Sequence, residues 1–148
     1  MCAQMLHFVR RTESQITEDH LRIRALLDGI KAVGDPHVLL PLLRELNDTL
    51  DGHFALEEGD DGLYAMAAEY SPARVDRVEE LLDEHRHLLA AVHALIQKCN
   101  KCIAGPLTEI RDDVHTLFGT IQNHDAAETE ILTEVLLKAM QGEPGESK

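Results

Sequence analysis

The sequence is poor in aromatic and in basic residues, and both shortages restrict what the protein can be. It has no Trp, and aromatic residues make up only 3% of the 148 positions, whereas hydrophobic residues of all kinds make up 44%. A chain whose apolar residues are mainly Leu, Ala, Val and Ile favours helices. Lys and Arg total 14 against 27 Asp and Glu, for a net charge of −13. Nucleic acid and anionic membranes bind basic surfaces, so neither is expected as a partner.

Long apolar runs and an even set of cysteines are also missing. No segment reaches the ~18 consecutive apolar residues of a membrane span. The first eleven residues lack the apolar run of a signal peptide. The three cysteines are an odd number in a chain that is long enough to build a core without disulfides. We therefore expect a protein of the reducing cytoplasm.

Pro and Gly interrupt the chain in few places, and the segments between them have helical periodicity. The breaks fall at 34–36, 59–62, 70–72 and 104–106. Apolar residues recur every three or four positions in the four segments of about 12–33, 36–58, 72–101 and 106–140. This pattern predicts an all-α fold, an antiparallel up-down-up-down four-helix bundle. We expect a single domain over 1–148, with a core of about 12–140 and a flexible tail at 141–148.

Each segment has one apolar stripe that we predict to face the core. The stripes consist of Ile16, Ile23, Leu27 and Ile30; Leu39, Leu43, Leu46 and Leu50; Val75, Val78, Leu82, Leu89, Val92 and Ile96; and Ile110, Val114, Leu117, Ile121, Ile131 and Val135. Six polar residues interrupt the stripes, namely His20, His53, Glu57, His85, His124 and Glu128. A buried imidazole or carboxylate is costly unless it is paired or binds a metal ion.

The spacing of these six residues places them at one level of the bundle. With about 1.5 Å of rise per residue, the chain runs about 13 residues from His20 to the first break and about 17 back to His53. The other two connections run about 14 residues out and 14 back, and about 19 out and 19 back. Outgoing and returning legs therefore match within about one helical turn.

The six side chains form a donor set for two metal ions. In the two His-x3-Glu pairs, the imidazole and the carboxylate lie one turn apart on one helix face. Two bridging carboxylates and four imidazoles would give each metal two His and a share in two Glu. Nitrogen and oxygen ligands without thiolate suit iron or manganese, and zinc is an alternative. The competing interpretation is six structural polar residues that satisfy one another.

The chain resembles the hemerythrin-like, or HHE cation-binding, domains over about residues 12–140. The resemblance rests on the segments 18–20, 53–58, 83–85 and 124–128, which read EDH, HFALEE, DEH and HDAAE. It implies a four-helix bundle with two iron ions, bridged by oxide or hydroxide, held by the six residues above. A ferritin-like site is disfavoured because it needs a Glu-x2-His pair on each of two helices, and the chain does not have two such pairs.

The sequence differs from the oxygen-carrying hemerythrins at two positions. Those proteins have a further histidine where this chain has Leu89, and a carboxylate where it has Thr129. Fewer protein ligands leave more open positions on the metal. We therefore expect a protein that binds or senses O2, NO or peroxide, through a separate output protein or as a homodimer. Two alternatives stay open: a peroxidase-like, catalase-like or iron-centre repair oxidoreductase, and a metal storage or structural module.

Several further residues are assigned to the core or the surface, with no role in metal binding. The sequence offers no obvious general acid or base beside the site. Tyr64 would line the approach to the metals only if the helix persisted past residues 59–62, so a core or surface position is preferred. Glu58 is interpreted as solvated, with a position directly behind the metal ligands as the alternative, and His87 and His93 are interpreted as surface or packing residues. The pair Cys99 and Cys102 is interpreted as incidental.

Overall fold

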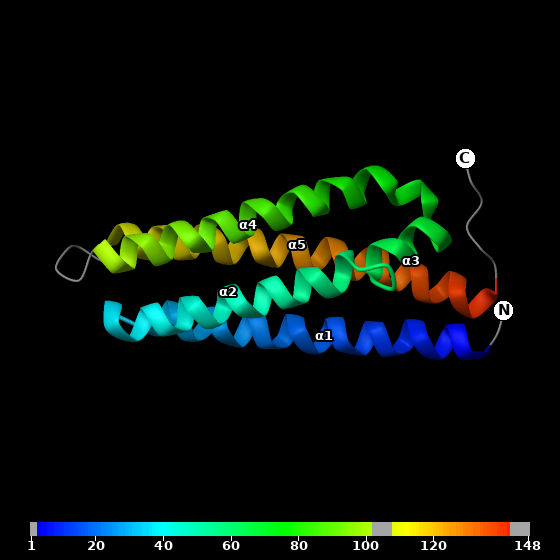
Figure 1. Cartoon of the computed structure of the whole chain (residues 1–148), viewed down its shortest axis with the longest axis horizontal. Coiled ribbons are helices and arrows are strands. Elements are labelled where there is room, and N and C mark those ends of the chain that lie inside the picture. The colour runs from blue at the N-terminus through cyan, green and yellow to red at the C-terminus, as the bar shows by residue number, and fades with distance from the viewer. Residues whose placement is uncertain (1–2, 102–107, 143–148) are drawn as a thin grey trace.

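The protein is a bundle of four long helices, seen in a computed structural model that describes residues 3–101 and 108–142 (Figure 1). The long helices are α1 (Ala3–Ala32), α2 (Pro36–Glu58), α4 (Val75–Lys101) and α5 (Thr108–Gln141). A short helix, α3 (Leu63–Tyr70), and a single 3-10 turn at Pro72–Arg74 connect α2 to α4. The described residues contain no strand. The predicted all-α class is confirmed.

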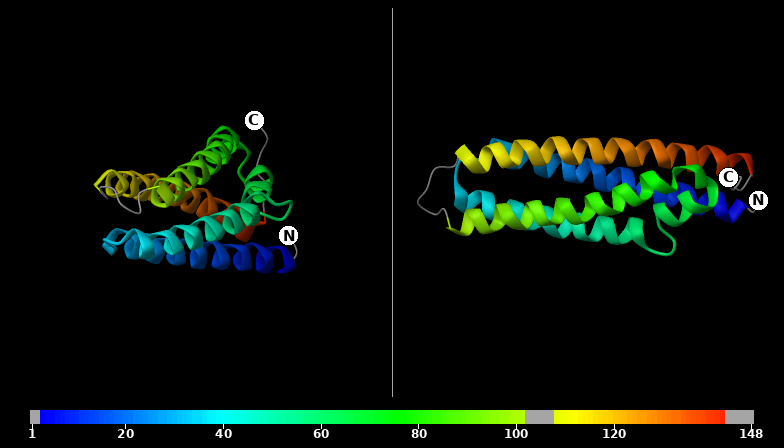
Figure 2. Two further views of the ribbon diagram at one scale, coloured as in Figure 1. Left: turned by 60° about the vertical axis from the view of Figure 1, so that its left-hand side comes forward. Right: turned by 90° about the horizontal axis from the view of Figure 1, so that it is seen from above.

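The four long helices pack as a ring in which each has two neighbours. α1 lies against α2 and α5, and α4 lies against the same two helices (Figures 1 and 2). Consecutive long helices run in opposite directions, as Figure 2 shows from above. The predicted up-down-up-down topology is therefore confirmed.

The first helix begins nine residues earlier than the sequence predicted. Its first turns carry Val9, which is fully buried, and Phe8, which packs against the same apolar cluster. Thr12, at which the sequence predicted the helix to begin, lies inside the helix and is buried. The second helix has the predicted bounds. Asp35 caps it, because its Oδ1 accepts a hydrogen bond of 2.9 Å from the His37 backbone N–H.

The third long helix shows which of two adjacent stripes faces the core. Each pair of neighbouring apolar residues offers two candidates, and the structure buries Leu81, Leu88 and Leu95. The predicted Leu82, Leu89 and Ile96 are only half-buried, and Val75 is 50% exposed. Both stripes are in helical register with His85, so the packing of the neighbouring helices decides between them. The stripe predicted on each of the other three long helices is buried as expected.

Three predictions fall partly outside the described residues. The fourth helix was expected from Pro106 and is described from Thr108, and residues 102–107, with Cys102, lie outside. In the expected tail, Gln141 is still helical, and residues 143–148 lie outside the described ranges. A single domain over 1–148 stays a prediction.

Helix α3 was not predicted, and a glycine at its start makes it possible. α2 ends at Glu58, and the chain turns through residues 59–62 before α3 begins. A Cβ at Gly62 would lie 2.4 Å from the Leu56 carbonyl oxygen and 2.3 Å from that of Glu57. This close approach lets α3 fold back onto α2, α4 and α5 (Figure 1).

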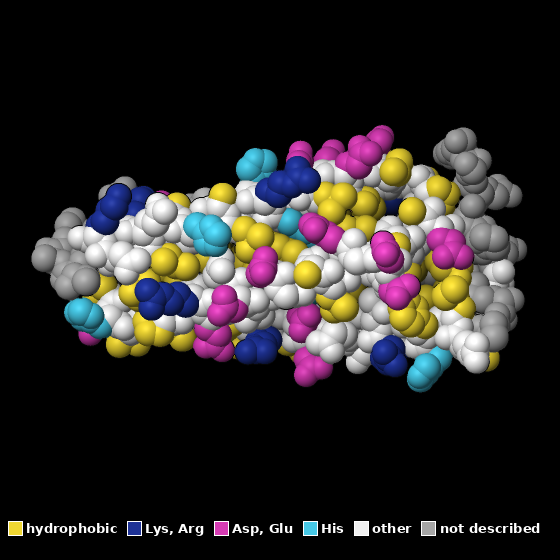
Figure 3. Space-filling model, in the orientation of Figure 1, with side chains coloured by type: hydrophobic (Ala, Val, Ile, Leu, Met, Phe, Trp, Pro, Cys, Tyr) yellow, Lys and Arg dark blue, Asp and Glu magenta, His cyan; other side chains and the backbone are white. Residues whose placement is uncertain are grey.

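The core consists of two apolar clusters. One fills the end of the bundle that holds the connection between α1 and α2, with Leu27, Leu43 and Leu95 among its members. The other lies toward α3 and includes Ile16 and Leu132. The predicted polar layer lies between them. On the face shown in Figure 3, acidic and basic side chains are interspersed over the surface. None of the described helices is both long and apolar enough to cross a membrane.

We expect Gly62→Ala to lower the free energy of unfolding by about 1–3 kcal/mol, because the added Cβ forces a shift of the α2–α3 turn. Urea unfolding followed by circular dichroism measures the effect. Gly52→Ala is the matched control: it lies inside α2, with nothing within 4 Å of the added Cβ. The control should stabilise the protein by about 0.5–1 kcal/mol. Equal effects of the two substitutions would contradict the assigned role of Gly62.

Candidate metal centre

The six predicted residues lie together in one layer between the long helices. The helices contribute as follows: α1 His20; α2 His53 and Glu57; α4 His85; and α5 His124 and Glu128. All six are buried, and none is more than 8% exposed. The convergence predicted from the lengths of the helical legs is therefore present in the fold.

Their ligand atoms form two overlapping groups. Within each group, one nitrogen or oxygen from every residue lies within 4.8 Å of all the others. The first group is His20, His53, Glu57 and Glu128, and the second is Glu57, His85, His124 and Glu128. The two carboxylates belong to both groups, and each imidazole pair belongs to one. This arrangement is that of a two-cation site with shared carboxylates.

Glu57 lies between one histidine of each group. Its Oε1 is 3.1 Å from His53 Nε2, one turn back on α2, and 3.6 Å from His85 Nε2 on α4. Both Glu57 oxygens are buried without a hydrogen-bond partner among the described residues. A carboxylate in this position needs a proton or a cation.

Glu128 has the corresponding place on α5. Its Oε1 is 3.2 Å from His124 Nε2 and 3.5 Å from His20 Nε2, and its Oε2 is 3.6 Å from His85 Nε2. Glu128 Oε1 and His124 Nε2 are close but do not form a hydrogen bond. Among the described residues neither atom has any other hydrogen-bond partner. A cation would satisfy these atoms together with those of Glu57, so the donor set fits a metal.

The pKa values reflect two carboxylates that share one buried space. Burial, and then the neighbouring Glu128, raises the pKa of Glu57 well above its usual range. In Glu128 burial acts in the same direction, but the surrounding His124, His20 and His85 and a protonated Glu57 outweigh it and hold the pKa well below its usual range. One carboxylate of the pair therefore keeps a proton when no cation balances the two charges.

Residues 12–136 match the hemerythrin HHE cation-binding domain family. The chain belongs to that family. No curated protein and no solved structure matches it significantly. The family description and the buried His/Glu layer agree that this domain carries a cation-binding site, and the geometry above places that site between the two apolar clusters.

Three carboxylates hold the outer nitrogens of the imidazoles in this HHE domain. The Nδ1 atoms of His53, His85 and His124 lie 3.0, 2.7 and 2.7 Å from carboxylate oxygens of Asp19, Glu58 and Glu84, respectively. Each imidazole donates its Nδ1–H to the carboxylate, which leaves the Nε2 lone pair directed at the centre. Glu58 is exposed as preferred, with 43% of its side chain accessible, and it also contacts a predicted ligand, which was the alternative. The sequence signal for these three carboxylates was weak, namely that each directly adjoins a predicted ligand.

Tyr64 contacts the polar layer, a position that the sequence offered as the less favoured alternative. α3 brings its hydroxyl 2.6 Å from Glu128 Oε2, to which it donates a hydrogen bond, and 2.8 Å from His85 Nε2. Burial, together with the nearby Glu128 and Glu57, raises the pKa of Tyr64, so the hydroxyl keeps its proton. Tyr64 is buried, as expected of a core position. The expectation that no acid or base lies beside the site is wrong, because this hydroxyl does.

The remaining neighbours are an aromatic ring and one more carboxylate. The Phe54 ring stacks on the imidazole of His85, with 3.7 Å between the ring centroids. Asp125 is buried beside His20, with Oδ1 3.6 Å from His20 Nε2, and burial raises its pKa to about 6. His87 and His93 point away from the layer and are exposed, as expected.

We expect Glu58→Gln to weaken metal binding about 10–100-fold, because His85 loses the negative charge that orients its ring and increases its basicity. Competition against a chelator of known affinity measures the change. Asp51→Asn removes one charge from an exposed position of the same helix and should leave the affinity unchanged. If the two variants have equal affinity, Glu58 does not support the site.

Metal affinity should fall as the pH falls from about 8 to about 6, by roughly tenfold per pH unit for each proton displaced. The raised pKa of Glu57 keeps this carboxyl protonated to higher pH than usual. In His124 burial lowers the pKa, but the nearby Glu128 and Glu84 outweigh it and raise the value. A cation must displace both protons. Calorimetric titrations in buffers of different ionisation enthalpy count the protons released, and a count of zero would contradict the prediction.

Proposed function

We propose that this HHE domain is a non-heme di-iron protein that binds or senses a small ligand. The six predicted residues would hold two metal ions, with Glu57 and Glu128 shared between them. The observation that carries the proposal is the pair of fully buried carboxylates between two imidazole pairs, whose oxygens have too few hydrogen-bond donors. The family match supports the same assignment.

The donor types favour iron, with zinc and manganese as alternatives. Four imidazoles and two carboxylates supply nitrogen and oxygen ligands, and no thiolate lies among them. Bound iron would supply one-electron chemistry and open coordination positions for an added ligand. The protein would supply four oriented Nε2 lone pairs and the two negative charges that balance the metal charge.

The burial of the layer favours a ligand of a few atoms, such as O2, NO or peroxide. Apolar clusters lie on both sides of the layer, and the most exposed of the six residues, His20, is only 8% accessible. A large substrate could not reach the layer without moving a helix. A sensing protein with this centre would pass its signal to a separate output protein or act as a homodimer.

The position of Tyr64 supports a second candidate, an oxidoreductase acting on peroxide. Its hydroxyl, which keeps its proton, lies 2.8 Å from His85 Nε2 and could donate a hydrogen bond to a peroxide bound beside that imidazole. Such a hydrogen bond would stabilise the negative charge that develops on oxygen as the O–O bond breaks.

Absorption spectra of the reduced, iron-loaded protein exposed separately to O2, NO and hydrogen peroxide test the proposal. A stable and reversible adduct with one of them is expected. Sustained consumption of peroxide would favour the oxidoreductase. Protein that carries only zinc and takes up no iron would contradict both candidates.

The ligand assignment has its own test in metal content. We expect His53→Ala and Glu128→Ala each to remove at least one metal ion per chain, because each deletes a buried ligand. His93→Ala is the matched control, since it removes an exposed imidazole from the same bundle. Metal analysis of the three purified variants decides the outcome, and unchanged content in the first two would reject the assignment.

A further inference from the structure

The metal centre has one edge that solvent reaches. The side chains of His20 and Asp125 are 10% and 11% exposed, whereas those of the other five predicted ligands are 2% exposed or less. His20 lies on α1 and Asp125 on α5, and these helices are neighbours in the ring. The edge is therefore the seam between α1 and α5.

Asp125 is directed at the centre from this edge. Its Oδ1 lies 3.6 Å from His20 Nε2, nearly the same distance as the 3.5 Å from Glu128 Oε1 to that nitrogen. The residue is only 8% exposed, so most of its hydration is lost. A buried carboxylate is costly without a positive partner. Asp125 is not in either group of converging ligand atoms, so it lies just outside the centre.

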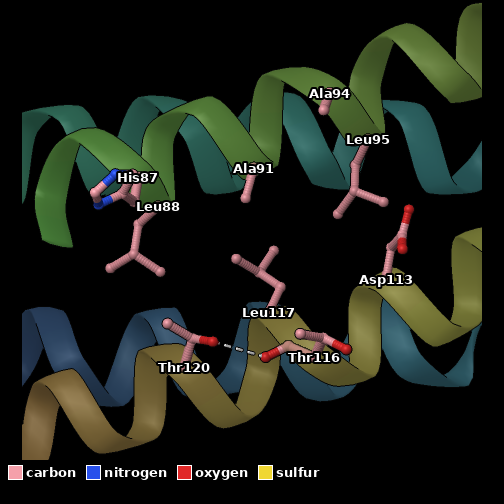
Figure 4. Close-up of a pocket in the computed structure, with 9 residues that line it drawn as sticks. All are labelled: His87, Leu88, Ala91, Ala94, Leu95, Asp113, Thr116, Leu117 and Thr120. Carbon is pink, nitrogen blue, oxygen red and sulfur yellow. Dashed lines mark hydrogen bonds between the residues drawn. The ribbon is translucent and has the colours of Figure 1, made fainter.

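Two other hollows of the surface suit a hydrated cation less well. A groove of about 380 Å³ between α4 and α5 is lined by Leu88, Ala91, Leu95 and Leu117, with polar side chains at its rim (Figure 4). A second, of about 470 Å³, lies beside the α2–α3 turn. None of the six predicted ligands lines either hollow. The apolar lining of the first cannot replace the water that a divalent cation loses. The second is lined in part by Asp60 and Asp61, but it does not reach any of the six predicted ligands.

We propose that divalent cations reach and leave the centre through the seam between α1 and α5, and that Asp125 is the first carboxylate to bind them there. This inference rests on the proposed ligation by the six residues. Asp125 replaces part of the hydration shell of the cation before His20 and Glu128 bind it. In the loaded centre Asp125 is not a ligand, so it affects the rate of uptake and not the number of ions bound.

Asp125→Asn tests the proposal because it keeps the size of the side chain and removes its charge. Stopped-flow absorption of Co2+ uptake by the metal-free full-length chain measures the rate, and circular dichroism checks that the bundle is folded. We expect about tenfold slower uptake with two ions still bound per chain. Asp112→Asn, an exposed change on the same helix, should leave the rate unchanged. An unchanged rate in Asp125→Asn, or the loss of one bound ion, would overturn the proposal.

A second variant does not depend on a buried substitution. Arg24 is exposed on α1, one turn beyond His20, and its positive charge acts on Asp125. Arg24→Glu should therefore speed Co2+ uptake several-fold at low ionic strength and less at high salt. Arg22→Glu makes the same change of net charge at an exposed position that pairs with Glu45, and should have a smaller effect. Equal rates in these two variants would count against the seam.

Metal binding by the six residues and uptake through the seam can be tested separately. If the wild-type chain takes up no divalent cation at all, the proposed function is wrong. If it takes up two ions at a rate that neither Asp125→Asn nor Arg24→Glu alters, only the assigned path is wrong.

Discussion

Two fully buried carboxylates facing each other across the bundle are the constraint on which the rest of this structure depends. Glu57 and Glu128 are 0% exposed, and both lie between apolar clusters. Two such charges repel each other and lose their hydration, so one of them must be neutralised by a proton or both by cations. The four imidazoles around them make cations the better solution. An apolar layer would have served stability alone equally well.

The parts of the fold outside the bundle core hold this layer in place. Asp19, Glu58 and Glu84 orient three imidazoles from the outside, at the solvent boundary, where a carboxylate costs little. The turn at Gly62 and the helix that follows it bring Tyr64 against Glu128. The centre thus has a supported side at α3 and a solvent-reached side at His20. The two groups of converging ligand atoms therefore have different surroundings, even though the six side chains are arranged nearly symmetrically.

Much of the fold and of the inner layer could be predicted because helical periodicity is a local property. The stripes of α1, α2 and α5 and the six polar interruptions can be read from spacing alone, and leg lengths place them at one level. The same reasoning failed on α4, where paired apolar residues such as Leu88 and Leu89 leave two stripes one residue apart. Packing against the neighbouring helices selects Leu88. The early turns of α1 were missed because their apolar residues pack in a cluster with residues of α3, α4 and α5, which lie far away in the sequence.

The sequence by itself determined the helical class, the order of the long helices and the identity of the six inner polar residues, because these follow from residue type and from distances along a regular helix. Only the tertiary structure decided which residues support them. Tyr64, Glu58 and Asp125 act across helices, and their positions depend on the turn at residues 59–62 and on the rotation of each helix about its axis. Neither is set by local propensity. The layer around the two buried carboxylates can thus be predicted from the sequence. The contacts that Tyr64, Glu58 and Asp125 make with it exist only in the packed bundle.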